Sequence, residues 1–487
     1  MNKTRLNTFI LVSLFILSLF LVSQTLLNTN IKLFRSISVS DKGNSRDLIS
    51  SQMIVPKKIL INYSEKTHTI LNSYNEYNLW EDTREILDDV FSYQGYMSKE
   101  IKKDEFDGAN DKKSLNIEFA DNIPVSLFTN IFSAPIEAMR FDGHINSIKN
   151  IYLSLENEDY IVLSDGEKYI KVSDIEYKDN GLLRTLEEIK ESPKFINYWP
   201  SDVSLGTKSD IYIPYRLPKD KKDIIVENDI KISGSTEDDK NMDKIAEGFF
   251  DKDLSYLRKV VDNSGVIIYM YDQNTGLLVY PSGLIEYSNT LNNKEVERNI
   301  NKSLDTLANF IMEKDRLPDN SYISKIEEIE SEDESKGYRF TFNYSINGKN
   351  VYINNKTGSE NTLISPLVAE VYGDTVTSYK RFYRDIIVKE SSNYGDKRIN
   401  PEEVIEKNLA KIKENFEGED TKLTSNIQSK FYKDILLSVK NISLGYYDKS
   451  STYYQTPLID VWIIDIKNER YIFDSGTGNL IDIKSLN

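Results

Sequence analysis

The chain has 487 residues, of which 39% are hydrophobic and 28% charged, and this balance excludes a disordered protein because enough apolar surface can be buried. The net charge of −16, the pI near 4.9 and the lack of a basic stretch interleaved with aromatic residues exclude nucleic acid as an expected partner. Without cysteine, the chain cannot form a disulfide scaffold, a thiolate metal site, a cysteine nucleophile or a lipid-modified N-terminal cysteine.

The first predicted element is a transmembrane helix over residues 8–27, TFILVSLFILSLFLVSQTLL, which carries no charge. About 20 residues at 1.5 Å each match the ~30 Å hydrocarbon core of a bilayer. A cleaved signal peptide is the alternative, but it has a shorter apolar core and a small-residue cleavage site, whereas this run ends in Gln24-Thr25-Leu26-Leu27. We expect residues 1–7 to be a short cytoplasmic tail and the polar, Ser-rich residues 28–54 to be a stalk.

Orientation in the membrane is weakly encoded. Lys3 and Arg5 precede the apolar segment and Lys32 and Arg35 follow it, so the positive-inside rule has little asymmetry to act on. The free amino group favours a cytoplasmic N-terminus. We therefore expect a single-pass protein of the cell membrane whose bulk is extracytoplasmic.

Beyond the stalk, alternating and helical apolar patterns predict a mixed α/β N-terminal domain over residues 55–235. A helix is expected at 79–91, and strands are expected at 57–63, 114–119, 149–155, 160–163 and 168–172. The polar, acidic run SGSTEDDKNMDK from Ser233 predicts an internal boundary, with a second unit beginning near Asp243.

Two later segments share one predicted order of elements, a helix followed by antiparallel strands and tight turns. They define a middle domain at 243–390 and a C-terminal domain at 391–487. In the first, a helix with Val296, Ile300, Leu304, Leu307 and Ile311 on one face precedes strands at 322–330, 338–346 and 351–353. In the second, a helix from Asn400-Pro401 precedes strands at 433–446, 458–466 and 471–473. The predicted fold class is therefore α+β, with two similar helix-plus-antiparallel-sheet domains.

The pattern Asp/Asn-x-x-Thr-Gly recurs at residues 272–276, 354–358 and 474–478. Its first side chain can accept backbone hydrogen bonds and its glycine can take positive φ, which predicts hairpin turns. A calcium loop is the alternative at Asp272, but its twelfth position is Gly283, which supplies no carboxylate.

Catalytic motifs are missing from the sequence. His68 and His144 are the only histidines and lie in different predicted stretches, so we expect ordinary surface or partly buried histidines instead of a metal site or a triad. With 77 acidic residues, carboxylate pairs arise by chance, and no Walker loop, GxSxG elbow, HExxH helix or dinucleotide fingerprint occurs. We therefore expect no enzymatic activity, no catalytic residues, no metal and no cofactor.

Several phrases carry a resemblance to a known family. They are PKKILINYS, YNLW, IEFADNIPVSLFTNIF, FFDKDLSYLRKV, IYMYDQNTGLLVYPSGLIEYSN, LPDNSYI and GYRFTFNYSINGKNVYI, which together span residues 56–353. In these phrases, and over nearly the whole chain, the sequence resembles the YycH family of membrane-anchored regulators of the Gram-positive cell-wall sensor histidine kinase YycG, also called WalK.

The resemblance implies one transmembrane helix, a three-part extracytoplasmic region and no catalytic residues. It also implies a YycI-like companion protein and inhibition of the kinase through contacts made largely by transmembrane helices. The C-terminal unit is in addition similar to PepSY modules. Two further hypotheses stay open: a PepSY-like inhibitor or chaperone of an extracellular peptidase, and a cell-envelope hydrolase that uses acidic residues.

Within the apolar segment, Ser13, Leu17, Phe20 and Gln24 fall on one stripe at 100° per residue. Lipid offers no hydrophobic drive between helices, so packing and hydrogen bonds from polar side chains hold them together. We therefore predict that this stripe contacts the kinase. The alternative is that Ser13 bonds its own helix backbone and that Gln24 sits at the level of the headgroups.

Overall fold

A computed structural model describes residues 52–486, with gaps at 73, 76, 94, 108–111, 130–131, 133–144, 157–159, 179, 208–210, 218–222, 229–235, 292–295, 354–364, 390–397, 418–424 and 450–454. The chain separates into two compact units, Met1–Leu48 and Ile49–Asn487. The first unit lies outside the described residues, and everything below concerns the second. Helices and strands are both abundant in it, so the fold is α+β.

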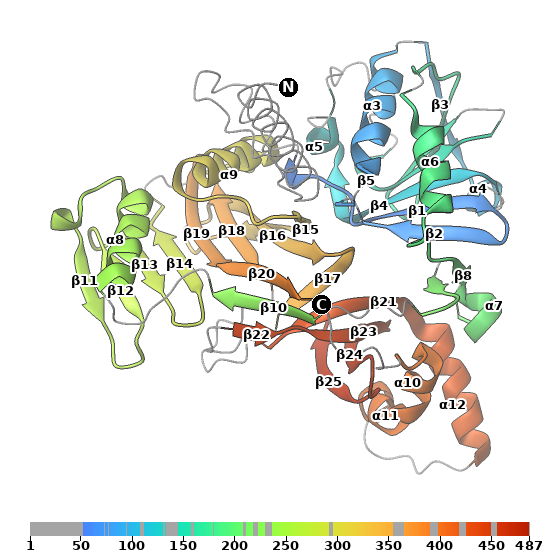
Figure 1. The fold of residues 1–487 in the computed structure, drawn as a ribbon. Helices are drawn as coiled ribbons and strands as arrows, with labels where there is room; N and C mark the ends of the chain where they lie inside the picture. The colour runs from blue at the N-terminus through green and yellow to red at the C-terminus, as the bar shows by residue number, and fades with distance from the viewer. Residues whose placement is uncertain are drawn as a thin grey trace, which may run out of the picture. The chain divides into compact units, whose positions relative to one another are not determined.

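A nine-stranded antiparallel sheet forms the first part of this unit (Figure 1). Its spatial order is β3-β7-β6-β5-β4-β1-β2-β8-β9. The strands are β1 Lys58–Ser64, β2 Thr67–Leu71, β3 Met97–Ile101, β4 Ser114–Pro124, β5 Ser147–Ser154, β6 Ile161–Ser164, β7 Tyr169–Ser173, β8 Tyr198–Pro200 and β9 Tyr212–Pro214. In β1, Ile59, Leu60 and Ile61 are all buried, as expected of an inner strand with both faces covered.

Five helices accompany this sheet. They are α3 Leu79–Ser92, α4 Lys103–Asp107, α5 Val125–Thr129, α6 Leu182–Glu191 and α7 Ser201–Leu205. Helix α3 buries Leu79, Ile86, Leu87 and Val90, which recur at helical spacing and so form one apolar face. Met53 and Ile54, at the end of the predicted stalk, are buried in the same core.

The rest of the chain builds a thirteen-stranded sheet from helix-then-strand segments. Helix α8 Thr236–Phe250 and the short 3₁₀ turn η2 Leu254–Tyr256 precede β11 Arg258–Val261, β12 Ile267–Met270, β13 Thr275–Val279 and β14 Leu284–Asn289. Helix α9 Ile300–Lys314 precedes β15 Ser321–Glu330, β16 Lys336–Ile346, β17 Lys349–Ile353, β18 Leu367–Tyr372 and β19 Thr375–Phe382. Helices α10 Pro401–Lys407, α11 Leu409–Glu417 and α12 Ser425–Ser438 precede β21 Val439–Asp448, β23 Ile459–Ile466, β24 Glu469–Asp474 and β25 Leu480–Ser485.

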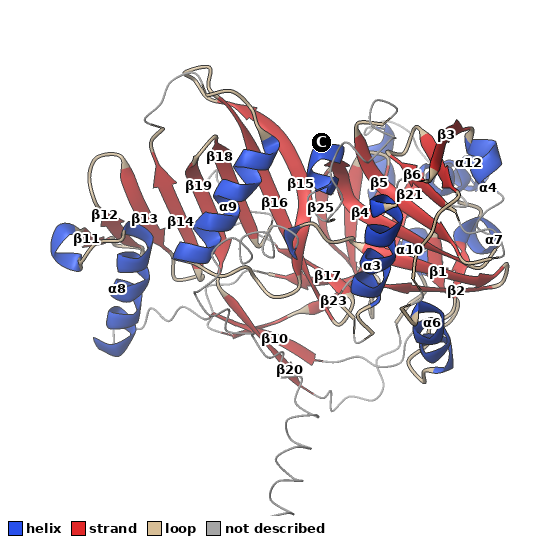
Figure 2. Ribbon diagram, turned by 90° about the horizontal axis from the view of Figure 1, so that it is seen from above, coloured by secondary structure: helices blue, strands red, loops and turns tan. Residues whose placement is uncertain are grey.

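Apart from β17 and β22 (Gln455–Pro457), sequential strands are neighbours in each of these three segments, so each helix is followed by a four-stranded meander. The meanders are β11-β12-β13-β14, β15-β16-β18-β19 and β21-β23-β24-β25. Pairing of β14 with β19 joins the first to the second, and the parallel pairing of β17 with β21 joins the second to the third. Figure 2 shows α8 and α9 on the same face of this sheet.

The connections between segments make a sheet of their own. Strand β10 Asp223–Asn228 leads into α8, β20 Arg384–Lys389 leads toward α10, and β22 Gln455–Pro457 lies between β21 and β23. They pair antiparallel in the order β20-β10-β22. Ile224 and Val226 of β10 are buried, so this sheet has an apolar side that packs on the main sheet.

Local signals in the sequence are confirmed at several points. Asn347 and Gly348 both have positive φ, 46° and 76°, as a tight hairpin between β16 and β17 requires. Helix α10 begins at Pro401. In α9, the Asn299 side chain caps the helix by accepting from the Lys302 backbone N–H at 2.9 Å.

Three expectations are corrected. Residues 433–438 belong to α12, so the predicted strand at 433–446 begins at Val439 instead. Helix α8 begins at Thr236, inside the polar run from Ser233, so part of that run is helical. The strand at 351–353 was expected to correspond to the strand at 471–473, but it does not. Strand β17 lies between β16 and β21 and is not part of the meander of the middle segment.

Candidate functional site

The predicted contact stripe Ser13, Leu17, Phe20 and Gln24 lies outside the described residues, as does the whole segment 8–27. Among the helices that the structure describes, none is long and apolar enough to cross a membrane. The stripe and the anchor therefore stay predictions.

The Asp-x-x-Thr-Gly turns have the predicted side-chain geometry at both sites that are described. The Asp272 carboxylate accepts from the backbone N–H groups of Asn274 and Thr275 at 2.7 and 2.8 Å. The Asp474 carboxylate accepts from those of Gly476 and Thr477 at 3.0 and 2.7 Å. The third copy, 354–358, lies outside the described residues.

The glycines of the two turns differ. Gly478 has the predicted positive φ of 68°, whereas Gly276 is not in that region because it already belongs to β13. In both turns the carboxylate oxygen is engaged by the backbone, so the motif is structural in this protein.

His68 is a buried structural histidine, whereas the sequence led us to expect a surface or partly buried one. Its Nδ1 lies 2.8 Å from Asn62 Oδ1, its Nε2 lies 3.0 Å from the Glu65 carbonyl oxygen, and its ring packs edge-on against Tyr212. His144 lies outside the described residues. Among the described side chains, no group of three His, Asp or Glu is placed to hold a metal ion.

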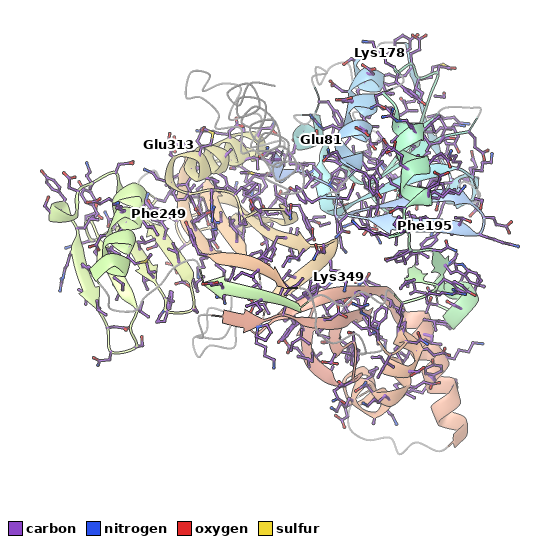
Figure 3. The ribbon with its side chains drawn as sticks, in the orientation of Figure 1. Glu81, Lys178, Phe195, Phe249, Glu313 and Lys349 are labelled. Carbon is purple, nitrogen blue, oxygen red and sulfur yellow. The ribbon has the colours of Figure 1, made fainter. Side chains whose placement is uncertain are left out.

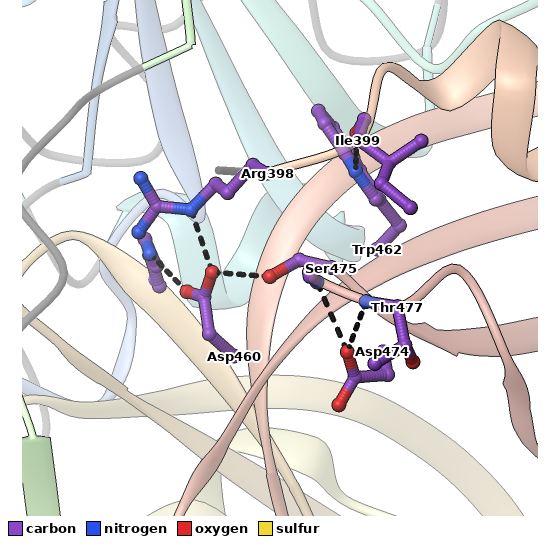
Figure 4. Close-up of polar contacts among 9 residues, drawn as sticks. Arg398, Ile399, Asp460, Trp462, Asp474, Ser475 and Thr477 are labelled. Atoms are coloured by element: carbon purple, nitrogen blue, oxygen red, sulfur yellow. Dashed lines mark hydrogen bonds and ion pairs between the residues drawn. The ribbon is translucent and has the colours of Figure 1, made fainter. Parts of the chain in front are cut away.

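One cluster of charged side chains is centred on Asp460 in β23 (Figure 4). Arg398 Nε donates to Asp460 Oδ2 at 2.6 Å, and Lys349 pairs with Asp460 Oδ1. Ser475 Oγ donates to Oδ2 at 2.6 Å. Lys349 begins β17, Arg398 precedes α10 and Ser475 follows β24, so four separate parts of the chain meet at one carboxylate.

Neighbouring backbone contacts extend this centre. The Ser475 N–H donates to the Asp460 carbonyl at 3.0 Å, and the Ile399 N–H donates to the Ser475 carbonyl at 2.8 Å. Trp462 Nε1 in turn donates to the Ile399 carbonyl at 2.8 Å. Lys349, labelled in Figure 3, belongs to the middle segment, and its side chain pairs with Asp460 of the C-terminal segment.

The chemistry of the Asp460 centre favours a structural role over a catalytic one. Burial alone would raise the pKa of Asp460, but Lys349 and Arg398 outweigh burial and lower this pKa to about 2. A carboxylate with so low a pKa is a weak general base, so it cannot activate the buried Ser475 hydroxyl as a nucleophile near neutral pH.

A second buried pair joins Arg381 of β19 to Asp315, just after α9. The side chains are 4% and 2% exposed, and Arg381 Nη1 lies 2.5 Å from Asp315 Oδ1. Tyr379 donates to Asp315 Oδ2 at 2.6 Å and Tyr383 donates to Oδ1. Burial, with the Asp315 charge adding to it, raises the tyrosine pKa values well above their usual range, so both stay neutral donors.

A third charged group lies where the nine-stranded sheet meets the rest of the unit. Lys58 Nζ is 2.9 Å from Glu118 Oε2. Burial opposes ionisation of Glu118, but Lys58 and Lys57 prevail and lower its pKa to about 2. Burial lowers the pKa of Lys57 to about 8, with Glu118 opposing this shift.

Direct hydrogen bonds also cross this junction. Asp121 Oδ2, in β4, accepts from the backbone N–H of Ile326, in β15, at 2.8 Å. Tyr74 donates to the Ser321 carbonyl at 2.6 Å. The described region is thus tied together by polar contacts between residues far apart in sequence.

One surface depression of about 370 Å³ lies between α8 and α9. Figure 3 labels Phe249 on α8 and Glu313 on α9, the two helices that flank it. Its lining is mixed aromatic and polar: Phe249, Phe250, Asp251, Tyr271, Thr275, Tyr287, Asn289, Phe310, Lys314, Asp374, Thr375 and Val376. Lys314, its one lysine, is paired with Asp251.

Sequence reasoning missed all three charged groups. Their members are 49 or more residues apart in most cases, and single charged residues such as Lys349 or Asp460 carry no local signature. A buried charge in a strand pattern, such as Asp460 and Asp465 within IDVWIIDI, is the one signal that the sequence offered.

Comparison with known proteins adds little to this picture. No family model and no curated protein sequence matches the chain. Among solved structures, an uncharacterized protein from Eubacterium rectale is 10% identical with a TM-score of 0.35, over 57% of this chain and 92% of its own. The Bacillus megaterium YpeB C-terminal domain is 14% identical with a TM-score of 0.22, over 52% of this chain and 98% of its own. Likenesses this weak carry no functional argument. The structure itself defines an α+β protein of antiparallel meanders.

Proposed function

We propose that the protein is a membrane-anchored extracytoplasmic regulator that binds a cell-wall sensor histidine kinase of the YycG/WalK type, together with a YycI-like companion, and inhibits the kinase. The observation that carries the proposal is the uncharged segment 8–27 ahead of a large folded region whose sequence phrases resemble the YycH family. An anchored protein shares the plane of the membrane with the kinase, so contacts between helices can regulate it.

The three charged groups are partnered within the fold. Asp460, Asp315 and Glu118 are each paired with a cation of the same chain, so their charges are not presented to a substrate. A region held in this way offers fixed surfaces to a partner.

The test targets the predicted stripe in the full-length protein in native membranes. Ser13→Leu combined with Gln24→Leu removes two polar side chains from the stripe. If each lost interhelical hydrogen bond contributes about 0.6 kcal/mol, kinase association weakens about eightfold. The readout is in-membrane crosslinking to the kinase at matched expression, together with transcription of the kinase-controlled genes.

A matched control is available in the same helix. Ser18→Leu with Thr25→Leu also removes two polar side chains, but these lie 120–140° from Ser13 at 100° per residue. The control should leave association unchanged. If the two double variants behave alike, the stripe is not the contact. If the wild-type protein itself gives no crosslink to the kinase in native membranes, the regulator proposal fails.

A second candidate is a PepSY-like inhibitor or chaperone of an extracellular peptidase. It is favoured by the repeated arrangement of a helix followed by a four-stranded meander. Under this function, the purified protein should slow a co-secreted peptidase or protect it from autolysis. The regulator proposal expects neither effect.

A further inference from the structure

The outer edge of β11 lies at one end of the thirteen-stranded sheet. In the described part of the chain, β11 pairs with β12 on one side only. An unpaired strand edge presents backbone N–H and C=O groups that can pair with another chain.

The register shows which backbone groups face outward. Asp262 N–H donates to the Val266 carbonyl at 3.0 Å, which makes these two residues a hydrogen-bonded pair. Hydrogen-bonded pairs alternate along an antiparallel ladder, so Val260 pairs with Ile268 in the same way, while Lys259 and Val261 do not bond to β12. The N–H and C=O groups of Lys259 and Val261 therefore point away from the sheet.

The pairing of β12 with β13 shows independently that the backbone groups of Lys259 and Val261 face away from the sheet. Tyr271 N–H donates to the Thr275 carbonyl at 3.2 Å, so Ile267 and Tyr269 direct their backbone groups toward β13. These are the residues opposite Val261 and Lys259. The backbone groups of Val261 and Lys259 consequently have no partner in β12.

Side chains beside this edge are those typical of an interface. Tyr256 and Val261 are 66% and 59% exposed, among the few large apolar side chains that are this open in the described residues. Arg258 is exposed, and among the described residues its guanidinium has no hydrogen-bond or ion-pair partner. Tyrosine and arginine, together with tryptophan, are enriched among the interface residues that contribute most of the binding energy.

The two faces of β11 differ. Lys259 Nζ is 2.8 Å from Asp243 of α8, so the helix covers the face that carries Lys259. Side chains alternate along a strand, which places Arg258 and Val260 together on the opposite face. The backbone groups of both residues bond to β12. A strand added at the outer edge would therefore form non-hydrogen-bonded pairs with them, and side chains lie closest in such pairs.

We propose that the β11 edge binds an extended segment of a partner protein by strand addition, and that this segment carries a carboxylate opposite Arg258 and an apolar residue two positions away, opposite Val260. Arg258 supplies a positive charge on a chain of net charge −16, which selects an acidic segment at this point. The inference does not depend on the membrane anchor or on the identity of the kinase.

The test uses the full chain in detergent and the probe acetyl-Thr-Val-Thr-Glu-Thr-Val-Thr-amide, which has Glu and Val two positions apart in either direction. Backbone hydrogen exchange is followed residue by residue. At a peptide concentration ten times its dissociation constant, exchange at Lys259 and Val261 should slow about tenfold. Exchange at Val260, which is already bonded to β12, should not change and serves as the internal control.

Two altered peptides distinguish the contribution of backbone hydrogen bonds to binding from that of charge. N-methylation of the two threonines that flank Glu removes the donors that would face β11 and should abolish the protection. Replacing Glu with Gln should weaken binding about two- to fivefold by removing the charge pair with the exposed Arg258. Equal protection by the N-methylated peptide would overturn the proposal. The proposal would also fail if the Glu peptide at about 1 mM did not protect Lys259 and Val261, because weaker binding than this is not counted as specific.

Variants complete the test. Arg258→Glu should abolish binding of the Glu peptide, whereas Arg184→Glu, the same change at an exposed arginine of α6, should leave it unaltered. Val261→Pro removes an outward N–H without removing a bond to β12, and it should abolish protection at Lys259. Urea unfolding curves that match the wild type show that each variant is folded. Binding that survives Arg258→Glu in full would refute the acidic partner.

Discussion

Replacing Asp460 with asparagine removes the one negative charge of the Asp460 centre while keeping its shape. Asparagine can still accept the Ser475 hydroxyl, which lies 2.6 Å away in the wild type. Arg398 and Lys349 lose the charge of Asp460 as a partner, and Arg398 remains buried with a side chain only 3% exposed. The variant therefore isolates the contribution of charge to the contact between β17, the segment before α10 and β23.

The structure sets the expected magnitude. A pKa lowered from 3.8 to about 2 corresponds to about 2 kcal/mol in favour of the folded state when Asp460 is charged. Removing one partner of a buried ion pair costs about 3–5 kcal/mol, because the remaining charge stays buried without compensation. We expect Asp460→Asn to reduce the free energy of unfolding of the C-terminal strands by about 2–4 kcal/mol.

The effect should depend on pH in a defined direction. The pKa is lower in the folded state than in the unfolded chain, so the stabilisation is fully present above about pH 4 and is lost as the pH falls toward 2. The difference in stability between wild type and Asp460→Asn should therefore shrink over this range. It should be constant between pH 5 and 7.

Trp462 provides the assay, because its indole N–H donates to Ile399 within the same network. Urea unfolding of the full chain in detergent is followed by fluorescence in a background in which Trp80 and Trp199 are replaced by phenylalanine. Glu313→Gln on the exposed face of α9 is the charge-matched control and should change stability by less than about 0.5 kcal/mol. Equal urea midpoints for Asp460→Asn and the control, or a difference that persists unchanged at pH 2, would refute the reasoning.

Three further predictions concern other polar contacts. The stability of the wild type should rise between about pH 8 and 10, because Lys57 releases its proton near pH 8 in the folded state but only near 10.5 in the unfolded chain. Lys57→Met should remove this contribution and flatten the rise. Urea midpoints measured against pH test this. Asp474→Ala should cost about 1 kcal/mol by removing the acceptor for two turn N–H groups, whereas Asp474→Asn should retain most stability in the same Trp462 assay. Asp315→Leu should cost about 3–5 kcal/mol in thermal unfolding, and adding Arg381→Met should recover part of it; a fully additive double variant would contradict the pairing.

Local structure was largely predictable from the sequence, because it depends on residues that are neighbours in the chain. The inner strand at Ile59–Ile61, the hairpin at Asn347-Gly348 and the start of α10 at Pro401 each follow from side-chain pattern or backbone preference. The Asp474 turn is of the same kind, since donor and acceptor lie within three residues. The error at 433–438 arose because an apolar run of that length suits either a helix or a strand.

Contacts between distant segments were decided only by the tertiary structure. No local pattern specifies that β17 runs parallel to β21, or that β10 and β20 pair to form a separate sheet. The same holds for Asp460, whose partners Lys349 and Arg398 lie 111 and 62 residues away.

The fold class and the expected membrane anchor follow from composition and periodicity, which any segment carries by itself. The buried charged groups and the open edge of β11 do not. A buried charge is stable only when its counter-ion is brought to it, and a strand edge is open only when no other strand takes it. Both conditions are set by the packing of the whole chain.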